Sequence, residues 1–128
     1  TLPQFRKTRR LDGAYTLTEQ DCHQAHADSI GLAADFEQVG DWYEIPYGCL
    51  YHPDCANMLA AGRMVSSDGW AWDVTRVIPV CALTGQAAGL AAAQLAASGQ
   101  TAAALPLEPL QNALREQGVV LHRADLAE

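Results

Sequence analysis

Basic residues are scarce over most of this 128-residue chain. Four of its eight Lys and Arg residues lie in the first ten positions, within the run RKTRR. The other 118 residues hold four basic residues against fifteen acidic ones, a net charge of −11. An acidic body repels phosphate backbones, so the composition argues against a nucleic-acid partner. We interpret the basic cluster as a polar strand whose arginines meet carboxylates elsewhere in the fold.

The sequence also lacks the cysteine spacings that mark metal or redox sites. Its four cysteines include no CxxC pair and allow three pairings into two disulfides, yet we expect mostly free thiols. Cys22, His23 and His26 would share a helical face. No fourth ligand stands at a sequence spacing typical of metal sites, so we expect no metal. Cys81 fits a small buried residue better than a thiol activated by a helix start. The four cysteines are Cys22, Cys49, Cys55 and Cys81.

The N-terminal residues contain no apolar run of the kind a signal peptide needs. The chain begins at Thr1 rather than Met, so we expect a processed chain or one cut from a longer protein. The sequence does not determine the cellular compartment, and it slightly favours the cytoplasm.

Charge is absent from Val77 to Ala97, a run of 21 residues dominated by Ala, Gly and Leu. Such a run raises the alternative of a membrane helix. Pro79 and the polar residues Thr84, Gln86 and Gln94 interrupt it, and Ala and Gly drive insertion weakly. We therefore predict a buried helix, ended by Gly99, whose small side chains let a sheet or a ligand approach its backbone.

The rest of the sequence predicts a mixed α/β fold. Two short strands are expected between Phe5 and Leu17, joined at Asp12-Gly13, followed by a helical stretch capped by Thr18. Residues 28–42 show no period and are expected to form a loop. Tyr43 to Tyr51 is typical of a strand, with Pro46 at an edge or a bulge.

The C-terminal half is expected to hold a strand–loop–helix unit and a second helix. The apolar run Asn57 to Ser66 fits a buried parallel strand, and residues 67–75 fit a loop before the long helix. The second helix runs from Pro109 to Gln117, with Leu110 and Leu114 on one face. Val119 to Leu121 fits a last short strand.

The start of the long helix is expected to lack a side-chain cap. Pro79 belongs in the first turn, so the cap falls near Val77 or Ile78, neither of which accepts a hydrogen bond. An anionic or carbonyl-bearing ligand would satisfy the free N–H groups. Water, Asp73 or Thr75 would serve equally well, and the residues alone leave both alternatives open.

Several motifs in one order resemble the C-terminal, flavin-contacting segment of FAD-dependent oxidoreductases. The run AGRMVSSDGWAWDVTRVIPVCALTGQAAGLAAAQLAASG, from Ala61 to Gly99, follows the pattern AGR-x-[IV]-S, a loop with Ala, RV-x-P and GQAAG-x-AA. Upstream, RRLDGAYTLTEQD, DSI and YEIPY are similar in order and spacing. The matching positions in the main run are Gly62, Arg63, Ser66, Ala71, Arg76, Val77, Pro79 and Gly85-Gln86-Ala87-Ala88-Gly89.

The resemblance implies a partial FAD-binding fold and a set of cofactor contacts. Residues 1–54 would belong to a substrate or cap-proximal region, and residues 55–128 to the C-terminal part of the FAD-binding domain. The Gly62-Arg63 strand end would lie by the ribityl chain, and the helix that opens near Arg76 would point at the flavin pyrimidine carbonyl. The implied cofactor-binding residues are Gly62, Arg63, Ser66, Ala71, Arg76, Val77, Pro79 and Gln86.

Two departures from the family pattern leave the substrate open. Many relatives carry His where this chain has Gly69, and Arg where it has Gly48. Trp70 and Trp72 flank Ala71, and they fit either the lining of a flavin or substrate cavity or the packing of the loop onto the core. No catalytic acid, base or nucleophile is indicated.

A further departure is the missing GxGxxG fingerprint, which the family uses to hold the FAD pyrophosphate. We therefore expect a missing N-terminal dinucleotide-binding portion as a partner, and an isolated chain that is inactive. The surfaces left bare would favour self-association. The alternative function is a non-enzymatic interaction module in which the long helix mediates that self-association.

Overall fold

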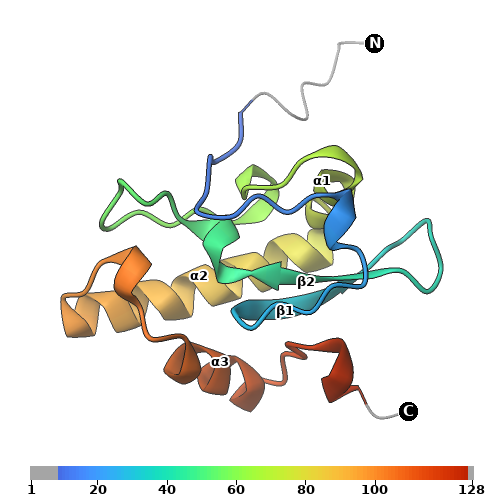
Figure 1. Ribbon diagram of the computed structural model, residues 1–128. Helices are drawn as coiled ribbons and strands as arrows, with labels where there is room; N and C mark the ends of the chain where they lie inside the picture. The colour runs from blue at the N-terminus through green and yellow to red at the C-terminus, as the bar shows by residue number, and fades with distance from the viewer. Residues whose placement is uncertain (1–8, 127–128) are drawn as a thin grey trace.

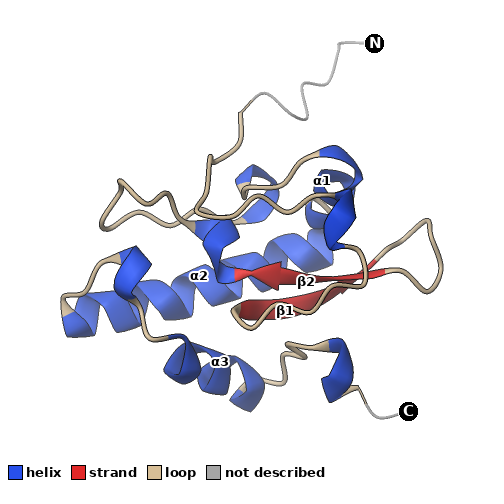
Figure 2. Ribbon diagram, in the orientation of Figure 1, coloured by secondary structure: helices blue, strands red, loops and turns tan. Residues whose placement is uncertain are grey.

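The computed structural model describes residues 9–126, whose fold is mixed α/β as expected (Figures 1 and 2). Two antiparallel strands and three α-helices are joined by five short 3-10 turns. The strands and helices are β1 (Ser29–Ala34), β2 (Trp42–Pro46), α1 (Gly69–Thr75), α2 (Ile78–Ser98) and α3 (Leu107–Glu116). The turns are η1 (Glu19–Asp21), η2 (Tyr47–Leu50), η3 (Gly62–Met64), η4 (Ala102–Ala104) and η5 (Arg123–Asp125).

Helix α2 forms where the uncharged run predicts it, and every other α-helix packs against it. Its buried residues, Val80, Thr84, Ala87 and Ala91, recur every three or four positions and so form one face. Gly99 ends the helix in the left-handed conformation, with φ 68°, and donates its N–H to the Leu95 carbonyl at 2.8 Å. The predicted helix and its glycine cap are confirmed, but the helix is buried on this face alone and not throughout as expected.

By length and composition α2 is also able to cross a membrane, with a mean hydropathy of 1.3 over its most apolar window. The chain buries 28% of that window. Because core helices of other proteins pass the same test, this property assigns no location.

The β1–β2 hairpin lies across α2 (Figure 1). Leu32 pairs with Glu44 and Ala34 with Trp42, and an irregularity separates Leu32 from Ser29. Gly31 permits the close approach to α2, because a Cβ there would lie 2.5 Å from Leu83 Cδ2. The prediction of a loop over residues 28–42 is therefore wrong for β1, and the strand predicted from Tyr43 ends at Pro46 rather than Tyr51.

Helix α3 covers the same core from another side and carries the chain back to the hairpin. Leu110 and Leu114 are fully buried, which confirms the predicted apolar face, although the helix begins at Leu107 rather than Pro109. The Val120 carbonyl then accepts a hydrogen bond from the Leu32 N–H at 2.9 Å. The short strand predicted at Val119 to Leu121 is not assigned as a strand, but this contact places the segment beside β1.

Three further expectations are corrected. Residues 9–17 form no hairpin at Asp12-Gly13, and the part of that prediction before residue 9 lies outside the described residues. Instead, the Leu11 N–H donates to Met64 and the Leu17 N–H to Ser66, because the segment pairs with distant chain rather than with itself. The expected strand at Asn57 to Ser66 contains only η3, and the expected loop at 67–75 contains α1, whose N-cap is Asp68.

A buried carboxylate joins β2 to the last described residues. The Glu44 side chain is 1% exposed and accepts hydrogen bonds from the backbone N–H groups of His26 at 2.8 Å and Arg123 at 3.0 Å. His122 Nδ1 lies 2.8 Å from the same carboxylate. A buried carboxylate is tolerated only when its oxygens are bonded in this way, so Glu44 fixes the C-terminal turn to the hairpin.

We predict that Glu44→Ala lowers the free energy of unfolding by about 2 to 4 kcal/mol, because the groups that Glu44 bonds are left without an acceptor. Urea unfolding followed by circular dichroism measures the change. Glu116→Ala, at an exposed position of α3, is the matched control. Equal stability of the two variants would contradict this account.

Candidate functional site

The candidate site is built around the N-terminus of α2. Val77 occupies the N-cap position with extended backbone angles, and among the described residues no side chain accepts a hydrogen bond there. Pro79 stands in the first turn, and Ile78 beside it is 85% exposed. The helix therefore presents free N–H groups, and the positive end of its dipole, at an open surface.

The two nearby side chains that were candidates for capping are engaged elsewhere. Asp73 Oδ1 lies 2.7 Å from Arg76 Nη2 and accepts a hydrogen bond from Arg76 Nε at 2.8 Å. The Thr75 hydroxyl is bonded to Ser67 Oγ at 2.8 Å and to the Trp72 carbonyl at 3.3 Å. This leaves the first turn open to water or to a ligand.

Turn η3 lies against the N-terminal half of α2. The Gly62 N–H donates to Thr84 Oγ1 at 2.9 Å, which fixes the turn to the buried face of the helix. Gly62 has φ 72°, a conformation that other residues adopt only with strain. Arg63 follows with an exposed side chain, and its carbonyl accepts a hydrogen bond from Trp72 Nε1 at 3.1 Å.

Arg76 adds a positive charge one residue before the N-cap of α2. Its guanidinium carbon lies 5.2 Å from the centre of the Trp72 ring, a cation–π contact that orients the side chain. The ion pair with Asp73 offsets part of that charge.

The structure brings together five of the eight expected cofactor-binding residues and places three elsewhere. The five near the start of α2 are Gly62, Arg63, Arg76, Val77 and Pro79. Ser66 is buried, and its hydroxyl is bonded to Gly13 N–H at 3.0 Å and Thr16 Oγ1 at 2.8 Å. Ala71 is buried in α1. Gln86 lies about two turns along α2 from Pro79 and donates to Gln117 at 2.6 Å.

Trp70 and Trp72 both pack α1 onto its surroundings. The Trp70 ring stacks on Phe36, with 5.9 Å between ring centres, and its Nε1 donates to Asp35. Trp72 is buried and bonded to η3. Of the two alternatives for these residues, the contacts within the chain support packing.

A cavity of about 430 Å³ opens beside η3, a feature that the sequence did not predict. Arg9, Arg10 and Arg63 line it together with Met58 and Met64. Arg10 is also paired with Asp68 at 3.6 Å, in line with the expectation that basic residues near the N-terminus meet carboxylates. Positive charge over apolar walls suits an anionic group attached to an apolar body. Its two halves come from segments about fifty residues apart, so no local motif reveals it.

The four cysteines carry free thiols, as expected. Burial raises the pKa of Cys49 to about 12. Burial also raises the pKa of Cys81, at the start of α2, although the Arg63 charge acts in the opposite direction. The raised pKa argues against an activated thiol, while Cys81 is only partly buried rather than fully buried as expected.

Comparison with known proteins decides the family. The family model described as FAD dependent oxidoreductase matches residues 1–114. The chain belongs to this family. No match was found among curated proteins or among solved structures.

The family match includes the whole of the proposed flavin-contacting run, from Ala61 to Gly99. FAD and oxidoreductase chemistry are therefore properties of the family to which the chain belongs. The family match assigns no role to an individual residue of this FAD-dependent oxidoreductase chain.

We predict that Cys81 reacts with iodoacetamide more slowly in the folded chain than in urea, because a raised pKa leaves less thiolate at a given pH. Arg63→Ala removes the charge that lowers this pKa, so it slows the reaction further and moves its onset to higher pH. Peptide mass spectrometry over a pH series gives the rates. Arg115→Ala, at an exposed site on α3, is the control, and equal rates for the two variants would contradict the assignment.

Proposed function

We propose that this chain is the C-terminal, flavin-facing portion of a FAD-dependent oxidoreductase. The N-terminus of α2 would face the flavin ring, and Gly62 and Arg63 would lie beside the ribityl chain. The observation that carries the proposal is the uncapped, exposed start of α2, with η3 beside it. Family membership supplies the cofactor class.

The residues near α2 fit a flat, electron-rich cofactor. Gly62 has no side chain to hold a ligand away from its backbone, and its positive φ accounts for glycine at that position. Ile78 offers apolar surface next to the free N–H groups of the first turn. Both features favour close approach of a ring with polar edges.

The chemical contribution of the chain would be electrostatic. Bound FAD supplies the hydride or electron chemistry. The free N–H groups at Val77 and Ile78, with the charge of Arg76, would stabilise negative charge that develops near them. No side chain here is assigned to proton transfer.

We propose a positioning role for the three expected residues that lie away from the start of α2. The Ser66 hydroxyl would hold the segment after η3 against Gly13 and Thr16. Ala71 would allow α1 to pack closely, since its side chain is fully buried. Gln86 would hold α2 to the end of α3 through Gln117.

We also propose that the chain divides after residue 54 into two functional regions. Residues 1–54 would belong to the substrate region and residues 55–128 to the FAD-binding domain. The arginine-lined cavity supports it, because Arg9 and Arg10 lie on one side of the division and Met58, Arg63 and Met64 on the other. A cavity between two portions is a common place for a substrate. The substrate class would then be anionic.

A separate N-terminal portion would bind the FAD pyrophosphate, because this sequence contains no GxGxxG. We propose that this portion also covers the exposed face of α2. Gly85 and Gly89 lie on that face, and a Cβ added at either would meet nothing within 4 Å. The same exposed face favours the alternative function, a module that associates with copies of itself.

We predict that Ile78→Glu lowers the reduction potential of the bound flavin relative to Ile78→Gln, in the flavin-loaded protein that contains this chain. The added carboxylate would sit at the free helix start and oppose negative charge on the ring. The fold is retained, because an acidic side chain in the first turn stabilises a helix by about 0.3 to 1 kcal/mol. Redox titration followed by flavin absorbance gives the potential.

Ala97→Glu, near the far end of α2, controls for added charge and should leave the potential unchanged. Equal potentials for the Glu and Gln variants at position 78 would contradict the proposed position of the flavin.

A further inference from the structure

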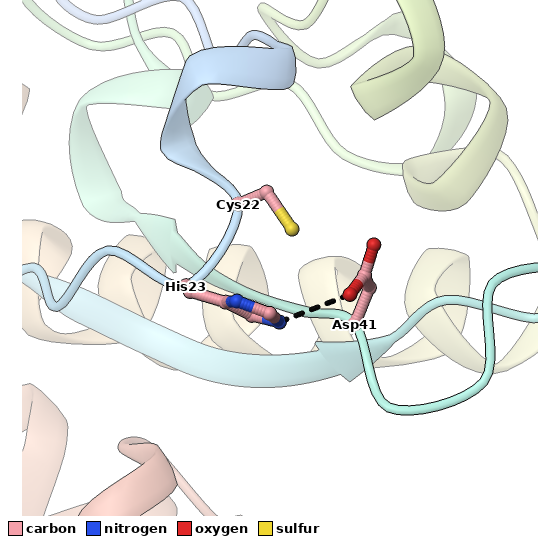
Figure 3. A group of neighbouring side chains, drawn as sticks. All are labelled: Cys22, His23 and Asp41. Atoms are coloured by element: carbon pink, nitrogen blue, oxygen red, sulfur yellow. Dashed lines mark ion pairs between the residues drawn. The ribbon is translucent and has the colours of Figure 1, made fainter.

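Three side chains with metal-binding groups converge at the loop end of the hairpin (Figure 3). Cys22 and His23 directly follow η1, and Asp41 directly precedes β2. One ligand atom from each lies within 4.8 Å of the other two. His23 Nε2 and Asp41 Oδ1 are 3.1 Å apart.

Backbone contacts hold this cluster in place. His23 has φ 62°, and among the described residues it is the only one other than glycine with a positive φ. Its N–H donates to the Trp42 carbonyl at 3.0 Å, and its ring lies 5.4 Å from the Trp42 ring. The Asp41 carbonyl accepts a hydrogen bond from the Asp35 N–H at 2.9 Å. Backbone hydrogen bonds thus fix the two segments relative to each other, and the His23 ring adds a contact with Trp42.

We propose that Cys22, His23 and Asp41 bind one Zn²⁺ ion, with water as the fourth ligand. Thiolate, imidazole and carboxylate are the three ligand types that zinc takes in proteins, and tetrahedral zinc with three protein ligands keeps one open position. The thiolate and the carboxylate together neutralise the charge of the ion. The mixture of sulfur, nitrogen and oxygen donors favours zinc over magnesium or calcium, which prefer oxygen alone.

The open position has room for water. A cavity of about 390 Å³ adjoins the cluster, and both Cys22 and Asp41 line it. Glu19, Gln38 and Tyr43 add polar groups to the same cavity. Glu19 remains outside the ligand set, because its Oε1 accepts a hydrogen bond from the Trp70 N–H at 2.8 Å.

The ligand set differs from the one that sequence spacing suggests. His26 is turned away, with its Nε2 3.5 Å from Asp21 and its ring packed on Tyr15. Asp41 takes its place from the far side of the hairpin loop. Zinc bound here would therefore link the segment after η1 to β2, and it would stabilise the folded chain by mass action.

The test is a zinc titration of the full 128-residue chain, with a chromophoric chelator as competitor and no flavin present. We expect one saturable step, a rise in Tm with zinc, and thiolate-to-metal absorbance when Co²⁺ replaces Zn²⁺. Cys22→Ser and Asp41→Asn should each weaken binding by about 10- to 100-fold or more, since even the loss of an outer partner of a metal ligand has that effect. His23→Asn should do the same while keeping the backbone, because Asn tolerates positive φ.

Cys55→Ser is the control, since it removes a partly exposed thiol outside the cluster. Circular dichroism establishes that each variant is folded. No saturable binding by the wild-type chain, or equal binding by Cys22→Ser, Asp41→Asn and the control, would overturn the proposal. The absence of flavin keeps this result separate from any failure of the proposed flavin site.

Discussion

The close packing of one face of α2 is the constraint on which the rest of the structure depends. Small residues such as Ala87 and Ala91 line this buried face, and the hairpin comes close enough that a Cβ at Gly31 would displace the Leu83 side chain. The hairpin, η3 and α3 all take their positions from this face. The helix start is fixed by the same packing, since Thr84 on the buried face holds Gly62.

The described residues offer two groups with different chemistry. At one end of α2, a helix start without a side-chain cap lies beside Arg76 and η3, where negative charge would be favoured. At the loop end of the hairpin, Cys22 and Asp41 offer anionic ligands to a cation. The first belongs to the function proposed from the family, and the second is independent of it.

The sequence predicted the elements whose signals are local. The long uncharged run predicted α2, and the spacing of Leu110 and Leu114 predicted the apolar face of α3. Strand β1 was missed because its residues are nearly all buried and do not alternate. The strand expected from Asn57 to Ser66 was wrong, because η3 interrupts the segment and Met58 and Met64 are exposed rather than buried. At the sites, Val77 and Pro79 were predicted from helix chemistry, whereas Asp41 was not, since only the folded hairpin brings it to His23.

Hydrogen exchange tests the central claim, that the start of α2 receives the flavin. The amides of Val77, Ile78 and Val80 should gain protection when FAD is added to the protein that contains this chain, because their N–H groups acquire acceptors. The end of α2 near Ser98 should not change. Unchanged exchange at Val77, Ile78 and Val80 in the flavin-loaded protein would contradict the claim, and protection of α2 that follows protein concentration instead of FAD would favour self-association.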